Sequence, residues 1–452
     1  MKKVDVKEII DTSKFGRFHL NLLIALLFIV LCDGYDMFYL GNIIPSLIAD
    51  WGITTVQAGA ITSSGLFGMV IGALVLGTLA DKIGRKASIF ISIVVFSGFT
   101  FLAGFSNDHI TFGILRFIAG LGIGGILPTL NASLAEYAPK KNRMTLIVLM
   151  NIGAPIGAVL TSVSAMYLLP DFGWRPVVWL GALPLLFLPL LFKIIPDSPA
   201  IYVKRNQKAK LANVLNRVVG ENIYTENDEF TLTVDSKKGS SVKKLFMNKR
   251  AVNTLLFWIA IFMNLIVLYG LSTWIPKIMQ NAGYSLVSSI SFLLMLKAGA
   301  ILGAIGGGRL SDRFGAKRVI YIYFMLAFFA LSILSLQPSS TLSYILLFIA
   351  GATTSGTQMV SNGYISQYYP TEIRSTGIGW TLGIGRIGAI IGPILGGYVL
   401  SQNVPYATNF LVFAIPCLIS AIAFWFVQEN FGKASVVAET NKNLETAIKI
   451  QN

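Results

Sequence analysis

Long apolar stretches separated by short polar ones follow one another along almost the whole chain. A helix needs about 20 mostly apolar residues to cross the hydrocarbon layer of a bilayer. The pattern predicts twelve such spans, at residues 18–44, 56–79, 87–106, 110–135, 143–168, 174–195, 251–280, 286–311, 317–336, 341–368, 374–400 and 406–430. The first run contains charges and lacks a small-residue cleavage site, so we interpret it as a retained span rather than a signal peptide.

The long polar break at residues 196–250 divides the predicted spans into two groups of six. The pattern therefore predicts five regions, with room for short amphipathic helices in the linker. These are a cytoplasmic N-terminus (1–17), a six-helix bundle (18–195), a cytoplasmic linker (196–250), a second six-helix bundle (251–430) and a cytoplasmic tail (431–452).

The composition fits this picture, because 54% of the residues are apolar and only 13% are charged. A soluble domain carries about 25% charged residues. Cys32 and Cys417 both lie inside predicted spans, so a disulfide framework is not indicated. His19 and His109 are isolated, and no metal-ligand cluster is visible. Neither a metal nor another cofactor is therefore expected.

The distribution of basic residues predicts the orientation in the membrane. With both termini inside, the outer loops carry only Arg175 and Lys277, and three more basic residues fall within spans. All the others of the 36 Lys and Arg lie in inner segments, as the positive-inside rule requires. The formal net charge of +15 is then explained by the anionic inner leaflet, and no nucleic-acid partner is needed. We expect a multi-pass protein of the cytoplasmic membrane.

The chain partly matches itself when it is shifted by 231 residues. GMVIGALVLGTLADKIGRK (68–86) then lies over GAILGAIGGGRLSDRFGAK (299–317), and the same shift aligns Pro45 with Pro276 and Arg143 with Arg374. Parallel repeats related by an axis along the membrane normal are a transporter architecture. The expected fold class is an all-α integral membrane protein with two six-helix halves.

Several motifs resemble the major facilitator superfamily, whose fold has twelve transmembrane helices. GTLADKIGRK (77–86) is similar to its signature loop, GGRLSDRFGAK (307–317) to the second copy and RFIAGLGIGG (116–125) to the fourth-helix motif. PDSPAIYVKR (196–205) resembles a segment that follows the sixth helix, with Asp197 where Glu is usual and Ala200 where Arg is usual. DGYDMFYLG (33–41) resembles the first helix of the aromatic acid:proton symporter family. That resemblance implies import of benzoate-type carboxylates with protons.

Charged residues inside the predicted spans are candidates for the chemistry, because each costs at least about 2.5 kcal/mol to insert. Asp33 and Asp36 are three apart, so they share one helix face, and two close carboxylates disfavour double ionisation. We predict proton binding there, with a structural salt bridge to another span as the alternative. By resemblance, Arg116 matches the fourth-helix motif and serves proton coupling, with ion pairing as its alternative.

Arg386 and Lys297 lie near the middle of their spans, and either could bind a substrate carboxylate. Arg does so with a planar, bidentate fork, so Arg386 is favoured. The alternative is that each cation neutralises an aspartate. The other possible substrate contacts are polar or aromatic positions on spans that line the cavity in this fold: Tyr35, Asn42, Asn264, Tyr269, Trp274, Thr354, Gln358 and Asn362. Trp274 could equally belong to an interfacial aromatic belt.

Charged residues of the inner loops are candidates for gating. Asp81 and Asp312 each precede a Gly by three residues in the repeated loop, where an acid could bond a helix end in one state and release it in another. Glu136 is expected to pair with Arg143 or with the loop at Asp81, which includes Arg85. The alternative is an ordinary positive-inside loop.

These observations predict a proton-coupled importer of a small organic acid, most plausibly an aromatic carboxylate, that works by alternating access as a monomer. The alternatives within transport are a dicarboxylate, a shikimate- or quinate-like acid, niacin or a sugar. A membrane sensor is the alternative from another class. No constellation of catalytic residues and no nucleotide-binding loop is present, so an enzyme is not expected.

Overall fold

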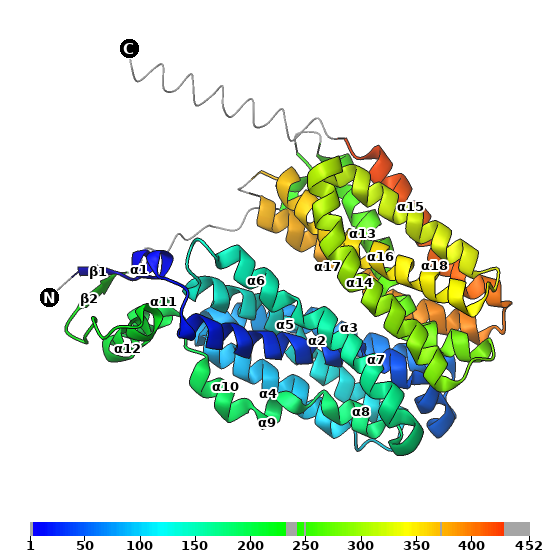
Figure 1. The fold of residues 1–452 in the computed structure, drawn as a ribbon, viewed down its shortest axis with the longest axis horizontal. Helices are drawn as coiled ribbons and strands as arrows, with labels where there is room; N and C mark the ends of the chain where they lie inside the picture. The colour runs from blue at the N-terminus through cyan, green and yellow to red at the C-terminus, as the bar shows by residue number, and fades with distance from the viewer. Residues whose placement is uncertain (1–2, 232–241, 248–249, 371–372, 429–452) are drawn as a thin grey trace, which may run out of the picture. The chain divides into compact units, whose positions relative to one another are not determined.

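The computed structural model describes residues 3–231, 242–247, 250–370 and 373–428, and the side chains of residues 3, 77, 78 and 80–82 lie outside this description (Figure 1). The chain divides into two compact units. Unit 1 comprises Met1–Ser236 and Ser285–Ser291, and unit 2 comprises Lys237–Tyr284 and Phe292–Asn452. The division between Ser236 and Lys237 falls within the predicted linker.

Long helices build unit 1. Five segments of it are long and apolar enough to cross a membrane by length and composition. They are α2 (Arg17–Trp51), α3 (Thr55–Ile83), α4 (Arg85–Ala103), α5 (His109–Tyr137) and the pair α6 (Arg143–Asn151) and α7 (Gly153–Phe172). The closest packing joins α3 to α5 and α2 to α7.

Proline positions explain where unit 1 departs from the predicted regular helices. The predicted span at 174–195 consists of three short helices, α8 (Arg175–Leu180), α9 (Leu183–Leu186) and α10 (Leu188–Ile194). Pro184 and Pro189 stand at the starts of α9 and α10, where a missing N–H is tolerated. The predicted fifth span is interrupted at Ile152, three residues before Pro155.

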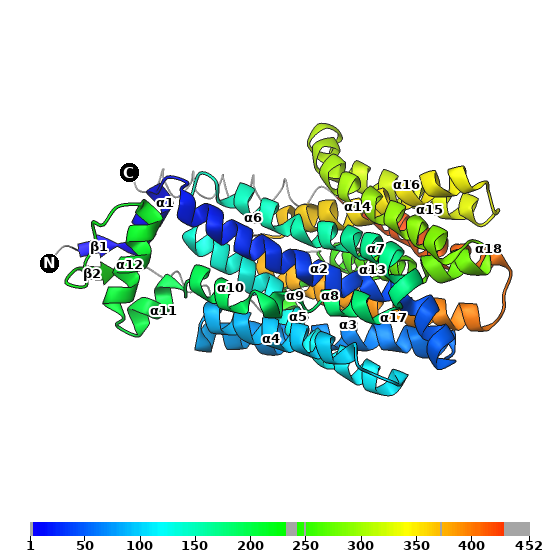
Figure 2. The same ribbon diagram turned by 60° about the horizontal axis from the view of Figure 1, so that its bottom comes forward.

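A small α/β assembly lies at one end of the unit 1 helices (Figure 2). Strand β1 (Lys3–Asp5) pairs in parallel with β2 (Glu229–Thr231), and helix α1 (Val6–Thr12) packs against α12 (Lys208–Val219). Together with α11 (Pro199–Lys204), these elements bury an apolar cluster that continues into the unit 1 core through Phe18. The helices α11 and α12 match the predicted amphipathic linker helices, whereas the sheet and the contribution of residues 3–12 were not predicted.

Unit 2 contains the second set of six long helices, apart from residues 286–291 at the start of α14, which belong to unit 1. They are α13 (Ala251–Asn281), α14 (Leu286–Phe314), α15 (Ala316–Leu334), α16 (Ser340–Tyr368), α17 (Arg374–Ser401) and α18 (Tyr406–Phe426), preceded by a short 3₁₀ turn at Val242–Leu245. All except α16 are apolar enough to qualify as membrane spans by composition. Polar residues concentrated between Thr353 and Asn362 set α16 apart from the other five helices.

Glycines of the sequence repeat make equivalent helix–helix contacts in the two units. A Cβ built on Gly72 of α3 would lie 2.0 Å from the carbonyl oxygen of Leu121, and one built on Gly303 of α14 would lie 1.9 Å from that of Ala352. Both pairs are related by the same 231-residue shift. Small residues allow such backbone contact between membrane helices. The two units therefore use the same glycine contacts to hold their second and fourth long helices together.

Candidate functional site

A buried ion pair joins α2 to α5 in unit 1. The Arg116 Nη1 donates to Asp36 Oδ2 at 2.8 Å, and its Nη2 donates to the Asp36 carbonyl oxygen at 3.3 Å. The Thr100 hydroxyl of α4 donates to the other carboxylate oxygen at 2.6 Å. Asp36 is 0% exposed and Arg116 is 3% exposed, so these contacts replace water around both charges. The predicted alternative of a structural salt bridge is realised for Asp36.

Asp33 has different surroundings, although it lies one turn away on the same helix. Its side chain is 1% exposed, and its Oδ1 has no hydrogen-bond partner among the described residues. Next to it, Gly34 packs so tightly on α7 that a Cβ would lie 2.2 Å from the Ala154 carbonyl oxygen. Asp33 also forms no ion pair among the described residues, in contrast to Asp36. The two acids that the sequence presented as a pair therefore have different surroundings in the structure.

Tyr35 and Asn42 of α2 bond to other helices of unit 1. The Tyr35 hydroxyl lies 2.7 Å from Ser164 Oγ and donates to the Val177 carbonyl oxygen at 3.1 Å. Asn42 Nδ2 donates to Thr161 Oγ1 at 3.0 Å. Both side chains are buried, so this geometry favours a packing role for each over the predicted substrate contact.

Lys297 of α14 is buried in unit 2, where its Nζ donates to Ser272 Oγ of α13 at 2.6 Å. A small enclosed pocket surrounds this contact, with Leu268, Gly351, Thr354 and Ser355 in its wall. The sequence placed Lys297 at mid-span, and the structure adds that its amine contacts the Ser272 hydroxyl. Other polar side chains of α13 and α16 form a strip of their own.

That strip is a chain of side-chain amides. Asn264 Nδ2 donates to Gln358 Oε1 at 3.0 Å and to the Thr354 carbonyl oxygen at 3.3 Å. Gln358 Nε2 in turn donates to Asn362 Oδ1 at 3.3 Å. The structure therefore brings together four of the predicted substrate contacts, all of them on α13 and α16.

The remaining candidates of unit 2 differ in exposure. Arg386 of α17 and Tyr269 of α13 are half-buried, and Arg386 forms no ion pair with an acidic side chain in the part of the chain that the structure describes. Trp274 is 0% exposed, and its Nε1 donates to the Pro393 carbonyl oxygen at 2.7 Å. Its ring lies against Gly396, so neither a lipid-facing belt position nor a substrate contact fits its surroundings.

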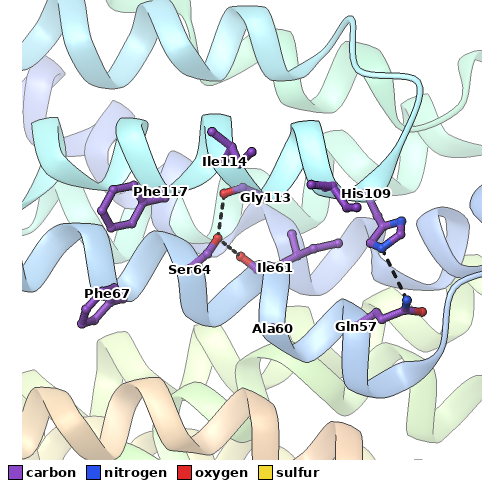
Figure 3. Close-up of a pocket in the computed structure, with 10 residues that line it drawn as sticks. Gln57, Ala60, Ile61, Ser64, Phe67, His109, Gly113, Ile114 and Phe117 are labelled. Atoms are coloured by element: carbon purple, nitrogen blue, oxygen red, sulfur yellow. Dashed lines mark hydrogen bonds between the residues drawn. The ribbon is translucent and has the colours of Figure 1, made fainter.

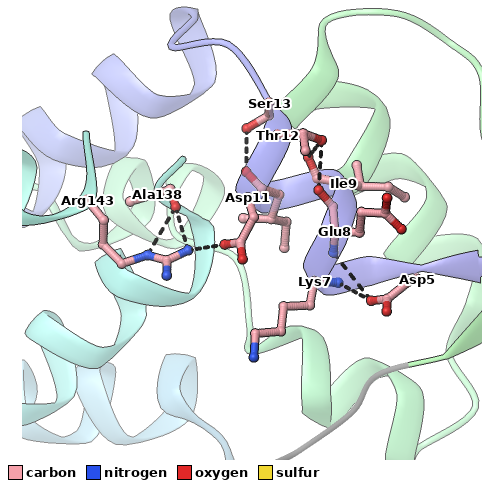
Figure 4. Close-up of polar contacts among 10 residues, drawn as sticks. Asp5, Lys7, Glu8, Ile9, Asp11, Thr12, Ser13, Ala138 and Arg143 are labelled. Atoms are coloured by element: carbon pink, nitrogen blue, oxygen red, sulfur yellow. Dashed lines mark hydrogen bonds and ion pairs between the residues drawn. The ribbon is translucent and has the colours of Figure 1, made fainter. Parts of the chain in front are cut away.

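The gating candidates form two ion pairs at the end of unit 1 that carries the small assembly. Arg85 Nε donates to Glu136 Oε1 at 2.6 Å, so Glu136 pairs with the signature loop and not with Arg143. Arg143 instead pairs with Asp11 of α1, and its guanidinium also donates to the Ala138 carbonyl oxygen (Figure 4). Asp312 is exposed, and the Asp81 side chain lies outside the described residues.

Residues of the 196–205 motif complete the start of α4. Gly84, at φ +104°, precedes α4 and offers no side-chain cap. Asp197 Oδ1 accepts the Lys86 N–H at 3.4 Å, so an acid from a distant segment caps this helix terminus. The Tyr202 phenol oxygen accepts the Asp197 N–H at 3.0 Å, and burial raises the pKa of that phenol.

Three of these contact residues were not predicted from the sequence: Thr100, Ser272 and Asp11. Thr100 and Ser272 are ordinary hydroxyl residues within apolar runs and carry no signal of their partners. Asp11 stands in a short polar segment that the sequence presented only as a terminus.

A surface groove runs between α3 and α5 of unit 1 (Figure 3). Its wall is mostly apolar and includes Phe67, Ile110 and Phe117. Ser64 donates to the Gly113 carbonyl oxygen at 2.9 Å, and His109 Nε2 lies 3.4 Å from Gln57 Nε2. None of the predicted site residues lines this groove, and its wall offers no lysine or arginine to a carboxylate.

Comparison with known proteins adds to this geometry. The model of the Major Facilitator Superfamily matches residues 26–307 and 291–449. The chain is 37% identical to a benzoate transport protein of Acinetobacter baylyi over 99% of this chain and 98% of that protein. It is 34% identical to a gentisate transporter of Corynebacterium glutamicum over 88% and 84% of the two chains. A solved bacterial homologue of the lysosomal transporter Spinster has the same fold, with a TM-score of 0.74, 17% identity and coverage of 93% and 99%.

Proposed function

The chain belongs to the major facilitator superfamily of membrane transporters, and from this premise we propose that it imports a small aromatic carboxylate together with a proton, by alternating access. The relatives named for benzoate and gentisate transport support the substrate class. Both substrates are flat rings that carry one carboxylate. A carrier for them needs a cation for the carboxylate and a group that binds the coupled proton.

Asp33 is the proposed proton site, and its surroundings are the observation that carries the proposal. Its carboxyl is buried and has no ion-pair partner among the described residues, whereas Asp36 is neutralised by Arg116. Because ionised Asp33 would be costly at this depth, its protonation should respond to the proton gradient. A buried acid that alternates between protonated and ionised forms is what proton coupling requires.

Arg386 is the proposed ligand of the substrate carboxylate. The acids of the sequence between residues 251 and 428 are Asp312 and Glu372, and both stand in inter-span segments of the hydropathy pattern. An arginine at mid-helix in that half therefore needs an anionic partner other than the acidic side chains of the same half. A carboxylate matches the guanidinium with two parallel hydrogen bonds. Lys297 remains the alternative cation, because it lies at similar depth on α14.

The remaining properties follow from the same mechanism. We propose a cytoplasmic-membrane location with both termini inside, because basic residues avoid the predicted outer loops. The proton gradient would supply the drive, so neither a cofactor nor catalysis is required, and a monomer would suffice. Each proton moved in excess of the substrate's negative charge would add about 2.3 kcal/mol of drive per 100 mV.

Uptake by proteoliposomes with an imposed pH gradient tests the proposal. Wild-type protein should accumulate labelled benzoate or a hydroxybenzoate when the outside is acidic. Asp33→Asn should abolish gradient-driven accumulation but retain exchange of substrate across the membrane, because the neutral amide imitates the protonated acid. Normal accumulation by Asp33→Asn would remove Asp33 from the coupling role. Transport of a sugar or a dicarboxylate without any aromatic acid would exclude the proposed substrate class.

A further inference from the structure

Asn264 on α13 holds a buried acceptor that no described side chain or backbone group satisfies. The residue is 0% exposed, and its Oδ1 has no hydrogen-bond partner among the described residues. Its Nδ2 is fully used, by Gln358 Oε1 at 3.0 Å and the Thr354 carbonyl oxygen at 3.3 Å. A buried polar atom without a partner costs about 1–3 kcal/mol. A donor is therefore missing at one defined oxygen.

The orientation of the Asn264 amide is fixed by chemistry. A side-chain amide can often be turned end for end, which exchanges its donor and acceptor. Here the Thr354 backbone carbonyl can only accept, so the Asn264 nitrogen must face it and the oxygen must face away. The unsatisfied atom is consequently the oxygen, which can bind only a donor.

Other buried asparagines can be compared with Asn264. Asn42 also has an unpartnered Oδ1, and the Thr161 hydroxyl that it contacts already donates its proton to the Ala158 carbonyl oxygen at 2.8 Å. Asn253 uses both ends on Gln428, with its nitrogen donating to the carbonyl oxygen and its oxygen accepting the N–H. Asn42 Oδ1 and Asn409 Oδ1 thus also lack a donor among the described residues, but neither residue occupies the position that Asp33 holds in the first half.

The internal repeat relates this unpartnered oxygen to the proposed proton site of the first half. Asn264 occupies the position that Asp33 holds in the first half, at the shift of 231 residues. Each is near the middle of the first long helix of its unit, and each has a buried, unpartnered side-chain oxygen. An amide does not release a proton at any accessible pH, so Asn264 cannot repeat a proton-binding role. It can only offer an acceptor.

We propose that Asn264 Oδ1 accepts a hydrogen bond from a ring hydroxyl of the transported acid, which makes Asn264 a specificity-determining residue. This inference rests on the proposed transport of aromatic carboxylates. The carboxylate itself cannot bond to an amide oxygen, because both only accept, so it is left to the basic residue. A phenolic hydroxyl ionises near pH 10 and is a donor at neutral pH. Hydroxylated aromatic acids should therefore be preferred over benzoate.

Wild-type protein gives the first test, by competition against a labelled substrate. Each hydroxybenzoate isomer is compared with the fluorobenzoate of the same substitution, since fluorine is similar in size to a hydroxyl but has no proton to donate. At least one hydroxybenzoate should compete about tenfold better than its fluoro counterpart, which corresponds to about 1.4 kcal/mol. If no isomer discriminates, the inference is wrong.

Variants test whether Asn264 causes the preference for a hydroxybenzoate over the matching fluorobenzoate. Asn264→Leu should reduce the ratio of hydroxybenzoate to fluorobenzoate competition about tenfold. Thr357→Val, which removes another buried polar group from α16, should leave the ratio unchanged. If Asn264→Leu does not fold, Gln358→Leu loosens the amide instead and should reduce the ratio about threefold.

The outcomes separate this inference from the proposed function. Wild-type protein that transports no aromatic acid would refute the proposed function. Transport with an unchanged ratio in Asn264→Leu would refute only the specificity role. A ratio that falls equally in Thr357→Val would also count against Asn264.

Discussion

Arg116 is held in unit 1 by three oxygen contacts on two residues of neighbouring helices, Asp36 and Thr100. The aromatic ring of Tyr39 lies under the guanidinium, 4.9 Å from its central carbon. The guanidinium thus has contacts on several sides, and Arg116 is only 3% exposed. Such a pair contributes little net stability compared with apolar residues, but removing one member leaves the other buried and uncompensated.

Asp36→Asn should therefore destabilise the protein by about 3–5 kcal/mol, because Arg116 keeps its charge. Thermal unfolding of the purified protein in detergent measures the effect. The double variant Asp36→Leu and Arg116→Met removes both charges and should recover most of the loss. Equal stability of Asp36→Asn and the wild type would show that the ion pair does not form.

Sequence reasoning at this scale located the charges but could not assign partners. Spacing alone shows that Asp33 and Asp36 share a face. Which of them meets Arg116 depends on the rotation of α2 relative to α5, which the sequence does not specify. Trp274 is the clearest case, because a tryptophan near the end of a span suits both an interfacial belt and the core, and only the packing against α17 decides.

At the scale of elements, the glycine contacts between α14 and α16 are the main constraint in unit 2. A Cβ on Gly303 would lie 1.9 Å from the Ala352 carbonyl oxygen, and one on Gly351 would lie 1.9 Å from that of Leu296. The two helices cannot keep this distance if either glycine gains a side chain. Gly308, on the same helix as Gly303, has open space where its Cβ would be.

Gly303→Ala should force α14 and α16 apart and lower both the yield of folded protein and its melting temperature. Gly308→Ala is the matched control and should be neutral or slightly stabilising, because alanine favours helix more than glycine does. Size-exclusion chromatography and thermal unfolding distinguish the two. Similar behaviour of both variants would contradict the close contact.

Element boundaries followed the apolar pattern well where helices are regular, and poorly where proline intervenes. The twelve predicted spans each overlap helical segments, but the predicted span at 174–195 is divided into three helices. Hydropathy is averaged over a window of residues, so it does not detect that a proline lacks a backbone N–H. The same averaging leaves α16 outside the apolar class although it is a regular helix, because it carries several polar residues, of which Gln358 and Asn362 join the amide chain with Asn264.

At the scale of the whole molecule, the segment before the first long helix is part of the fold. Val6 and Ile10 of α1 are buried in the cluster formed with α12, and strand β1 adds a hydrogen-bonded edge to β2. Residues far apart in the chain thus stabilise one another outside the long helices. The sequence could not predict this, because seven residues are too few to carry a helical pattern by themselves.

Ile10→Asp should detach this assembly by placing a charge in the apolar cluster. Trypsin added to inside-out vesicles should then cleave within residues 204–217 much faster than in the wild type, since α12 loses its cover. Ile223→Asp changes an exposed residue to the same side chain and is the control. Protection that persists in Ile10→Asp would contradict a structural role for residues 3–12, and cleavage in right-side-out vesicles would contradict the proposed orientation.

The capping of α4 by Asp197 affects where the gene can be divided if the protein is to be expressed as two polypeptides. The first half of the repeat ends near residue 195, but the start of α4 is completed by a carboxylate beyond that point, and β1 finds its partner strand only at Glu229–Thr231. Two polypeptides expressed separately to reassemble in a cell should therefore be separated after Thr231. A break near residue 195 would leave the first polypeptide without Asp197 and without strand β2.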